Sequence, residues 1–276
     1  MAGPTPLLDA AIKAAFAAGR EIMAVYSRPV AVELKEDRTP LTEADKRAHA
    51  AIAEVLGGSG LPLLSEEGAK APAAERQRWD QYWLVDPLDG TKEFIRRNGE
   101  FTVNIALMQR DAEPAGPLGS HRPVAGVILV PAKDVLYFVW EGGGAYRLEE
   151  ATTLKGRPAY ELAASAKRLP MPHHRNAFTI VASRSHASPD TDAFIARMER
   201  IHGQVDTINM GSALKICLVA EGAADAYPRY APTMEWDTAA GQAIAEAAGR
   251  ALLDTSTGAP MRYNKHNLVN QWFIVQ

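Results

Sequence analysis

The stretch WLVDPLDGT, residues 83–91, runs from an apolar segment into two closely spaced acids. We expect its apolar part to be a strand that enters the core and then ends abruptly. Pro87 restricts φ and cannot donate to a β-ladder, and Gly90 tolerates a positive φ. Asp86 and Asp89 are therefore predicted to lie on a stiff turn at a strand end, close enough to share a cation. The competing interpretation is an Asx-rich turn that caps the helix predicted to follow.

Further acids stand at the ends of other predicted elements. Glu66 and Glu67 follow a short strand candidate, and at most one of them can point at a given site because successive strand side chains alternate. Asp237 opens the last long predicted helix, and Asp45 lies in the first turn of a helix that Thr42 can cap. Acids in a first helical turn are favourable with the helix dipole, so Asp45 and Asp237 could be structural.

The composition is that of an ordinary globular protein, because 47% of the 276 residues are hydrophobic. The net charge of −3 gives no general attraction for nucleic acid or anionic membranes, so any phosphate recognition must be local. Cys217, the only cysteine, excludes an intrachain disulfide and lies in an apolar run, as a core residue would. We expect neither a signal peptide nor a membrane span.

The first half of the chain carries the pattern of one layered α+β unit. Two helices, at 6–26 and about 42–56, are expected to cover a largely antiparallel sheet. The polar, Ala- and Pro-rich residues 69–80 are expected to form a loop. The expected strands are 61–64, 82–85, 101–107, 124–130, 135–140 and 145–148.

The pattern changes in a polar, proline-interrupted stretch between about 148 and 176. Strands and helices alternate after it, which predicts an α/β second domain. We therefore predict an α+β domain at 1–150 with most of the acids and an α/β domain at 151–276 with Asp237. The expected elements of the second domain are strands at 179–182, 205–208, 224–227 and 251–253 and helices at 189–200, 212–220 and 237–248.

The combined motifs resemble the inositol-monophosphatase-like superfamily of metal-dependent, lithium-sensitive phosphatases over nearly the whole chain. This resemblance rests on PLTEAD (40–45), SEE (65–67), DPLDGT (86–91) and WDTAAG (236–241). Within the superfamily, other stretches are similar to the 3′(2′),5′-bisphosphate nucleotidases of the CysQ type. These are LDGTKEF (88–94), RNGEFTVNIAL (97–107), SRSH (183–186), GSALK (211–215) and YPR (227–229).

The resemblance implies a layered α/β/α/β sandwich of the inositol monophosphatase and fructose-1,6-bisphosphatase type, with the site between two domains. It implies two or three Mg²⁺ ions, which prefer hard oxygen ligands. Asp45 and Thr91 would orient and deprotonate the attacking water, with no covalent intermediate. The implied metal ligands are Glu66, Asp86, the Leu88 carbonyl, Asp89 and Asp237.

The activity implied is Mg²⁺-dependent removal of the 3′-phosphate from adenosine 3′,5′-bisphosphate (PAP), giving AMP and phosphate. The same activity on the sulfated nucleotide (PAPS to APS) would also support sulfur assimilation. A second phosphate needs its own cation, for which Arg229 is the best candidate. The implied substrate contacts are Glu66, Leu88, Asp89, Gly90, Thr91, Ser183, Arg184, His186, Ser212, Lys215, Arg229 and Asp237.

Two local features depart from the simplest form of this interpretation. Glu235 puts an extra acid beside Asp237, which either opposes an anionic ligand or faces away, and Ala231 stands where glycine is common in the family. An inositol-phosphate or sugar-bisphosphate phosphatase and a non-catalytic metal- or nucleotide-binding regulator are the alternatives. The expected setting is the cytoplasm. A peripheral place at the cytoplasmic face of the inner membrane, and the choice between monomer and homodimer, are left open.

Overall fold

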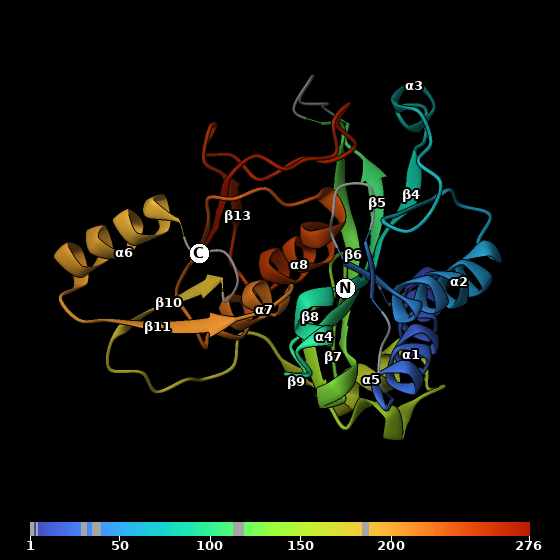
Figure 1. The fold of residues 1–276 in the computed structure, drawn as a ribbon, viewed down its shortest axis with the longest axis horizontal. Helices are drawn as coiled ribbons and strands as arrows, with labels where there is room; N and C mark the ends of the chain where they lie inside the picture. Colours follow the sequence, from blue (N-terminus) through green and yellow to red (C-terminus); the bar gives the residue numbers. More distant parts are fainter. Residues whose placement is uncertain (1–2, 4, 29–31, 35–39, 113–118, 184–187) are drawn as a thin grey trace.

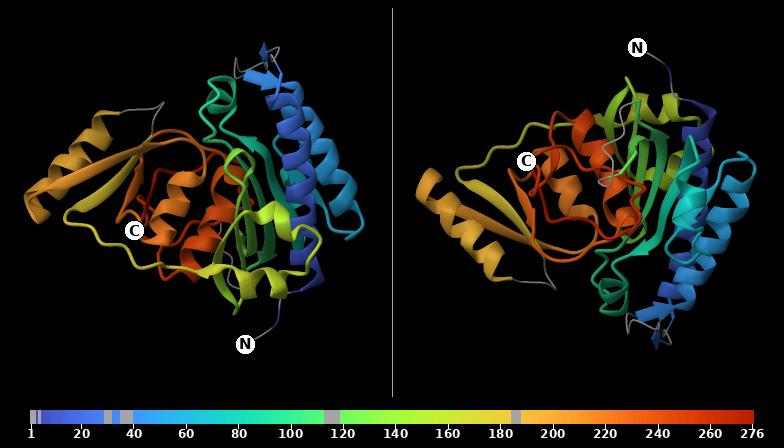
Figure 2. Two further views of the ribbon diagram at one scale, coloured as in Figure 1. Left: turned by 90° about the horizontal axis from the view of Figure 1, so that it is seen from below. Right: turned by 90° about the horizontal axis from the view of Figure 1, so that it is seen from above.

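The computed structural model describes residues 3, 5–28, 32–34, 40–112, 119–183 and 188–276, which form a layered molecule. Two long helices, a large sheet, a second pair of helices and a smaller group of strands follow one another across the molecule (Figures 1 and 2). None of the helices in the described ranges is long and apolar enough to cross a membrane.

The outer helical layer consists of α1 (Pro6–Tyr26) and α2 (Glu43–Gly57), as the sequence predicts. Proline at the start of α1 is compatible with a first helical turn, and the apolar face of this helix is buried. Thr42 and Asp45 form a capping box at the start of α2, which satisfies backbone donors that would otherwise lack a partner. A two-stranded ribbon of β1 (Val32–Leu34) and β2 (Pro40–Thr42) precedes α2.

The central sheet has seven strands in sequence order, antiparallel except for the parallel pair β3 and β4. Its register is irregular between Asp86 and Asp89, so the predicted turn is wrong: the strand continues through a bulge as far as Asp89. The strands are β3 (Leu63–Ser65), β4 (Gln81–Asp89), β5 (Thr102–Arg110), β6 (His121–Val130), β7 (Val135–Trp140), β8 (Gly144–Glu149) and β9 (Lys167–Arg168).

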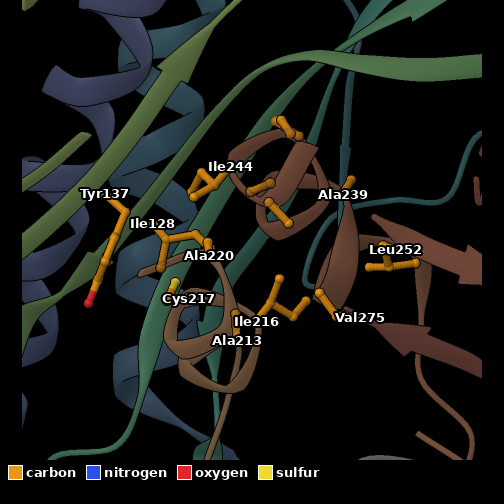
Figure 3. Packing of buried hydrophobic residues seen from close by; sticks show 14 of the residues in the cluster. Ile128, Tyr137, Ala213, Ile216, Cys217, Ala220, Ala239, Ile244, Leu252 and Val275 are labelled. Carbon is orange, nitrogen blue, oxygen red and sulfur yellow. The ribbon is translucent and has the colours of Figure 1, made fainter. Parts of the chain in front are cut away.

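The second face of the sheet is covered by α7 (Leu214–Glu221) and α8 (Glu235–Ala247). Figure 3 shows Ile128 and Tyr137 of the sheet facing side chains of these helices, among them Cys217. Cys217 is fully buried in this core, as predicted. Gly126 permits the close approach of α8, because a Cβ at this position would lie 2.6 Å from the Ala240 carbonyl oxygen.

The final layer contains the strands of the second half of the chain. β10 (Phe178–Ser183) pairs in parallel with β11 (Val205–Met210), and α6 (Pro189–His202) packs on them. β14 (Phe273–Val275), which the sequence analysis missed, lies between β12 (Tyr227–Arg229) and β13 (Leu252–Asp254). The short helices elsewhere are α3 (Ala73–Arg76), α4 (Thr91–Ile95), η2 (Pro131–Lys133), η3 (Ala151–Leu154) and α5 (Ala159–Ser165).

The layered α/β/α/β fold is confirmed. The central sheet extends past residue 150, because β9 pairs with β8. The division into domains at 1–150 and 151–276 stays a prediction. Residues 69–80 contain the short helix α3, where the sequence predicts only a loop.

Candidate active site

Elements from both halves of the chain surround one cavity of about 260 Å³. The end of β3, the bulge of β4, the start of α7 and the start of α8 contribute to its wall. Ten of the predicted site residues lie there together: Glu66, Asp86, Leu88, Asp89, Gly90, Thr91, Ser212, Lys215, Arg229 and Asp237.

Three acids of this cavity are separately anchored by hydrogen bonds. The Leu88 amide donates to Asp86 Oδ1 at 3.0 Å, so the bulge itself orients this carboxylate. The Met234 amide donates to Asp237 Oδ2 at 2.8 Å, which makes Asp237 a cap of α8 as well as a wall residue. Asn104, opposite Asp86 on β5, donates to Asp89 Oδ2 at 3.3 Å.

The acids are electrostatically crowded. Burial raises the pKa of Asp86 well above its ordinary value, and the charges of Glu66, Asp89 and Asp237 raise it further. Burial also raises the pKa of Asp237, with the charge of Asp89 as the next cause. Burial raises the pKa of Asp89 too, although the nearby Lys215 ammonium opposes this effect. The fully ionised cluster therefore requires a compensating cation.

The chemistry of these donors fits a hard divalent cation such as Mg²⁺, which binds carboxylate and carbonyl oxygens. Glu66 interacts with the Asp86 carboxyl group and is one cause of the raised pKa of Asp86. Within the described ranges, no three His, Cys, Asp or Glu side chains are arranged around a common point as metal ligands. A bound divalent cation would offset the repulsion between these acids.

Asp45 and Thr91 meet beside the cavity although 46 residues separate them in sequence. Asp45 Oδ2 accepts from the Thr42 amide and hydroxyl, both at 2.7 Å, as a helix cap. Its Oδ1 accepts from the Thr91 hydroxyl at 3.2 Å. The structural and the functional interpretations of Asp45 are thus compatible, because each uses a different oxygen.

Gly90 places Thr91 at the start of α4. Its φ of 93° lies in the left-handed region, and a Cβ would meet the Glu100 carbonyl oxygen at 3.1 Å and Ser212 Cβ at 3.3 Å. Only glycine adopts this conformation without strain in so little space. Gly90 therefore allows the end of β4, which carries Asp86 and Asp89, to pack closely against Ser212 near the start of α7.

Two buried cations complete the cavity. Lys215 is 7% and Arg229 is 8% exposed. Burial lowers the pKa of Lys215 to about 8, although the charge of Asp89 raises it, and its ammonium donates to the Ser212 carbonyl at 2.7 Å. Arg229 donates to the Pro232 carbonyl at 3.2 Å, and its buried Nε has no hydrogen-bond partner within the described part of the chain. Such donors suit an anionic ligand.

Other predicted site residues lie elsewhere or outside the described residues. Arg184 and His186 are among the residues that the structure does not describe, and Ser183 is placed only as the last residue of β10. Glu235 faces away from the cavity and is paired with Lys265, which decides between the two orientations considered from the sequence.

Sequence reasoning missed several residues of the cavity. Glu93, Thr233 and Phe273 line it, and Asn104 holds one of its acids. An asparagine within the otherwise apolar strand 101–107 was a usable signal for the last of these, because a buried amide needs a polar partner. Nothing in the local sequence distinguishes Phe273.

The comparison with known proteins establishes the family of this chain. The model of the Inositol monophosphatase family matches residues 4–272, and the chain belongs to this family. The crystal structure of an inositol monophosphatase from Thermotoga maritima has the same fold, with a TM-score of 0.71, 24% identity and coverage of 98% of this chain and 91% of that one.

More specific relatives share the name CysQ. The 3′(2′),5′-bisphosphate nucleotidase CysQ of Escherichia coli K12 is 41% identical over 98% of this chain and 99% of its own length. The Salmonella typhimurium protein of the same name is 43% identical over 88% of each chain. The crystal structure of CysQ from Bacteroides thetaiotaomicron has a TM-score of 0.85 and 49% identity, and the match covers 97% of this chain and 95% of that one.

Proposed function

We propose that this protein is a Mg²⁺-dependent 3′(2′),5′-bisphosphate nucleotidase that hydrolyses the 3′-phosphate of adenosine 3′,5′-bisphosphate. AMP and inorganic phosphate are the products, and the sulfated nucleotide is a second substrate of the same chemistry. The observation that carries the proposal is one cavity that holds both a four-carboxylate cluster and two buried cations. The similarity to CysQ nucleotidases over nearly the whole chain supports it.

The acids would hold the metal. Glu66, Asp86, Asp89 and Asp237, with the Leu88 carbonyl, are the proposed ligands of two or three Mg²⁺ ions. Bound Mg²⁺ lowers the pKa of the attacking water and neutralises charge on the phosphoryl group in the transition state. Family membership supports Mg²⁺ as the metal.

The proposed reaction is direct displacement by water. The attacking water gives a proton to the Thr91 hydroxyl, which passes its own proton to the Asp45 carboxylate through the contact observed at 3.2 Å. The bond from phosphorus to the ribose 3′-oxygen breaks as the bond to the water oxygen forms. The 3′-oxygen leaves with a proton that solvent supplies, so no covalent intermediate is needed.

The buried cations would recognise the second phosphate. Among the described residues, Arg229 Nε in the cavity wall has no hydrogen-bond partner, and a planar guanidinium binds phosphate through two hydrogen bonds. Lys215 and Ser212 are the further proposed contacts, together with Gly90, Ser183, Arg184 and His186. The single buried cysteine supports a reducing, cytoplasmic setting.

Steady-state kinetics tests the assignment directly. We expect kcat/KM for adenosine 3′,5′-bisphosphate to exceed that for inositol 1-phosphate and for fructose 1,6-bisphosphate, and activity to disappear when Mg²⁺ is chelated. A preference for the inositol or sugar phosphate would select a sister activity of the family. No turnover of any of the three with Mg²⁺ present would favour a non-catalytic binding protein.

A further inference from the structure

The start of α8, which presents Asp237 to the cavity, is held by the chain segment 264–270. The Glu235 amide donates to the Leu268 carbonyl at 2.9 Å. The Asn270 side chain donates to the Met234 carbonyl at 2.7 Å. The orientation of this helix start is therefore set by a segment that contributes no side chain to the cavity wall.

Glu235 fastens the helix start to the same segment. Its carboxylate is fully buried and accepts from the amides of Asn264 at 2.8 Å and Lys265 at 3.0 Å. The Lys265 ammonium completes the set as an ion pair at 2.9 Å. A buried carboxylate with this many donors is well compensated, whereas removal of its partners would leave a costly buried charge.

Arg76, the last residue of α3, binds the other side of this segment. Its guanidinium donates to Asn264 Oδ1 at 2.8 Å and to the carbonyls of Lys265 and His266 at 3.1 and 3.2 Å. The Asn264 side chain donates back to the Arg76 carbonyl at 2.8 Å. Arg76 is only 3% exposed, so these bonds form away from competing water.

Lys70 makes a second connection between the Glu66 turn and α8. Its ammonium donates to the carbonyls of Ser65 at 2.6 Å and of Glu66, and it lies over the Trp236 ring at 4.7 Å from the centroid. Lys70 thus contacts the backbone of the proposed metal ligand Glu66 and the ring of Trp236, which precedes the proposed ligand Asp237.

We propose that Lys70, Arg76, Glu235 and Lys265 are positioning residues that hold Glu66 and Asp237 at a set separation and thereby determine the affinity for Mg²⁺. The two acids belong to segments 171 residues apart in sequence, and their repulsion pushes the segments apart unless other contacts oppose it. Groups that orient metal ligands typically change metal affinity by about 10- to 100-fold when removed. This inference rests on the proposed function, because it assumes that the acids bind Mg²⁺.

Isothermal titration calorimetry with Mg²⁺ tests the proposal on Glu235→Gln, Arg76→Lys and Lys70→Gln. Glu235 uses a different oxygen for each amide, so glutamine retains an acceptor for only one of them and also loses the ion pair. Lysine at position 76 cannot reach all the acceptors of Arg76. We expect each variant to bind Mg²⁺ about tenfold more weakly. At saturating Mg²⁺ and substrate, kcat should remain within about threefold of wild type. The substitutions weaken the binding of Mg²⁺, and a saturating concentration of the metal fills the site again.

Glu221→Gln is the matched control. Glu221 is also a buried glutamate, paired with Arg147 at 3.3 Å and bonded to the Tyr137 hydroxyl, at the far end of α7. It should lose thermal stability without losing Mg²⁺ affinity. Equal loss of Mg²⁺ affinity in this control would overturn the proposal in favour of general destabilisation.

The remaining outcomes separate the two levels of inference. Wild-type Mg²⁺ affinity in the variants would overturn the positioning role alone. No Mg²⁺ binding by the wild-type protein would overturn the proposed function and this inference with it. Lys70 is exposed, so Lys70→Gln can decide the matter even if a variant of the buried residues does not fold.

Discussion

Replacing Arg229 with methionine should specifically impair recognition of the second phosphate. Methionine preserves the apolar stem of the side chain and removes the guanidinium. The wall of the cavity should then lose a cation that is 8% exposed and has a free Nε donor among the described residues. The scissile phosphate should be little affected, because the acids and their metals would bind it.

The expected size of the effect follows from the donors that Arg229 has left. One Nη is engaged with the Pro232 carbonyl, so Nε and the other Nη remain for a phosphate. Hydrogen bonds to charged groups are each worth about 1.5–3 kcal/mol. We take a net loss of ~2–3 kcal/mol of binding free energy for the two hydrogen bonds together, because removing the guanidinium also removes the cost of desolvating it. This loss corresponds to a rise of ~30- to 150-fold in KM.

The assay compares adenosine 3′,5′-bisphosphate with adenosine 3′-monophosphate, which lacks only the second phosphate. Arg229→Met should raise KM for the bisphosphate by the full factor and for the monophosphate by less than about threefold, since the interaction is absent there. Arg197→Met, on the exposed face of α6, is the matched control and should change neither KM. An equal rise for both substrates would refute the reasoning and assign Arg229 to the scissile phosphate or to the fold.

Four further predictions concern the acids and the metals. Asp86→Asn should leave less than about a tenth of wild-type kcat, a loss above ~1.4 kcal/mol, yet circular dichroism should show an intact fold; higher residual activity would exclude Asp86 as an essential metal ligand. Thr91→Ala and Asp45→Asn should each lower kcat strongly, and the double variant should lose less than the two losses combined because both act on one water; full additivity would separate them. The pKa values of Asp86 and Asp237 are raised, so the folded state retains protons which the unfolded state releases, and the metal-free protein should lose stability as pH rises above 3.8, the ordinary pKa of aspartate, towards the raised values. Mg²⁺ should restore stability most at the higher pH, and thermal melts that rise with pH without metal would contradict this. Lithium sensitivity is typical of the family, so Li⁺ should inhibit turnover. A competing small cation should act at about tens of millimolar, and full activity at that Li⁺ concentration would count against the metal assignment.

Local patterns in the sequence predicted those features that depend on nearby residues. The apolar spacing of residues 6–26 predicts α1 with its observed bounds, because helical periodicity is a property of contiguous residues. Thr42 likewise predicts the start of α2 as a helix cap, and the structure adds that Asp45 completes a capping box there. The turn expected at Asp86 was wrong, since pairing with β5 extends β4 through a bulge, and strand pairing is not a local property.

The motifs identified the acids, but only the tertiary structure decided which side chains share a space. The contact of Asp45 with Thr91 and the place of Arg229 beside the acids depend on layers that meet between distant parts of the chain. Glu235 could not be oriented from sequence, because its direction depends on backbone amides about 30 residues away. Residue types and short-range periodicity thus determine the elements and the available chemistry. Long-range packing determines distances, burial and pKa, and therefore how that chemistry can be used.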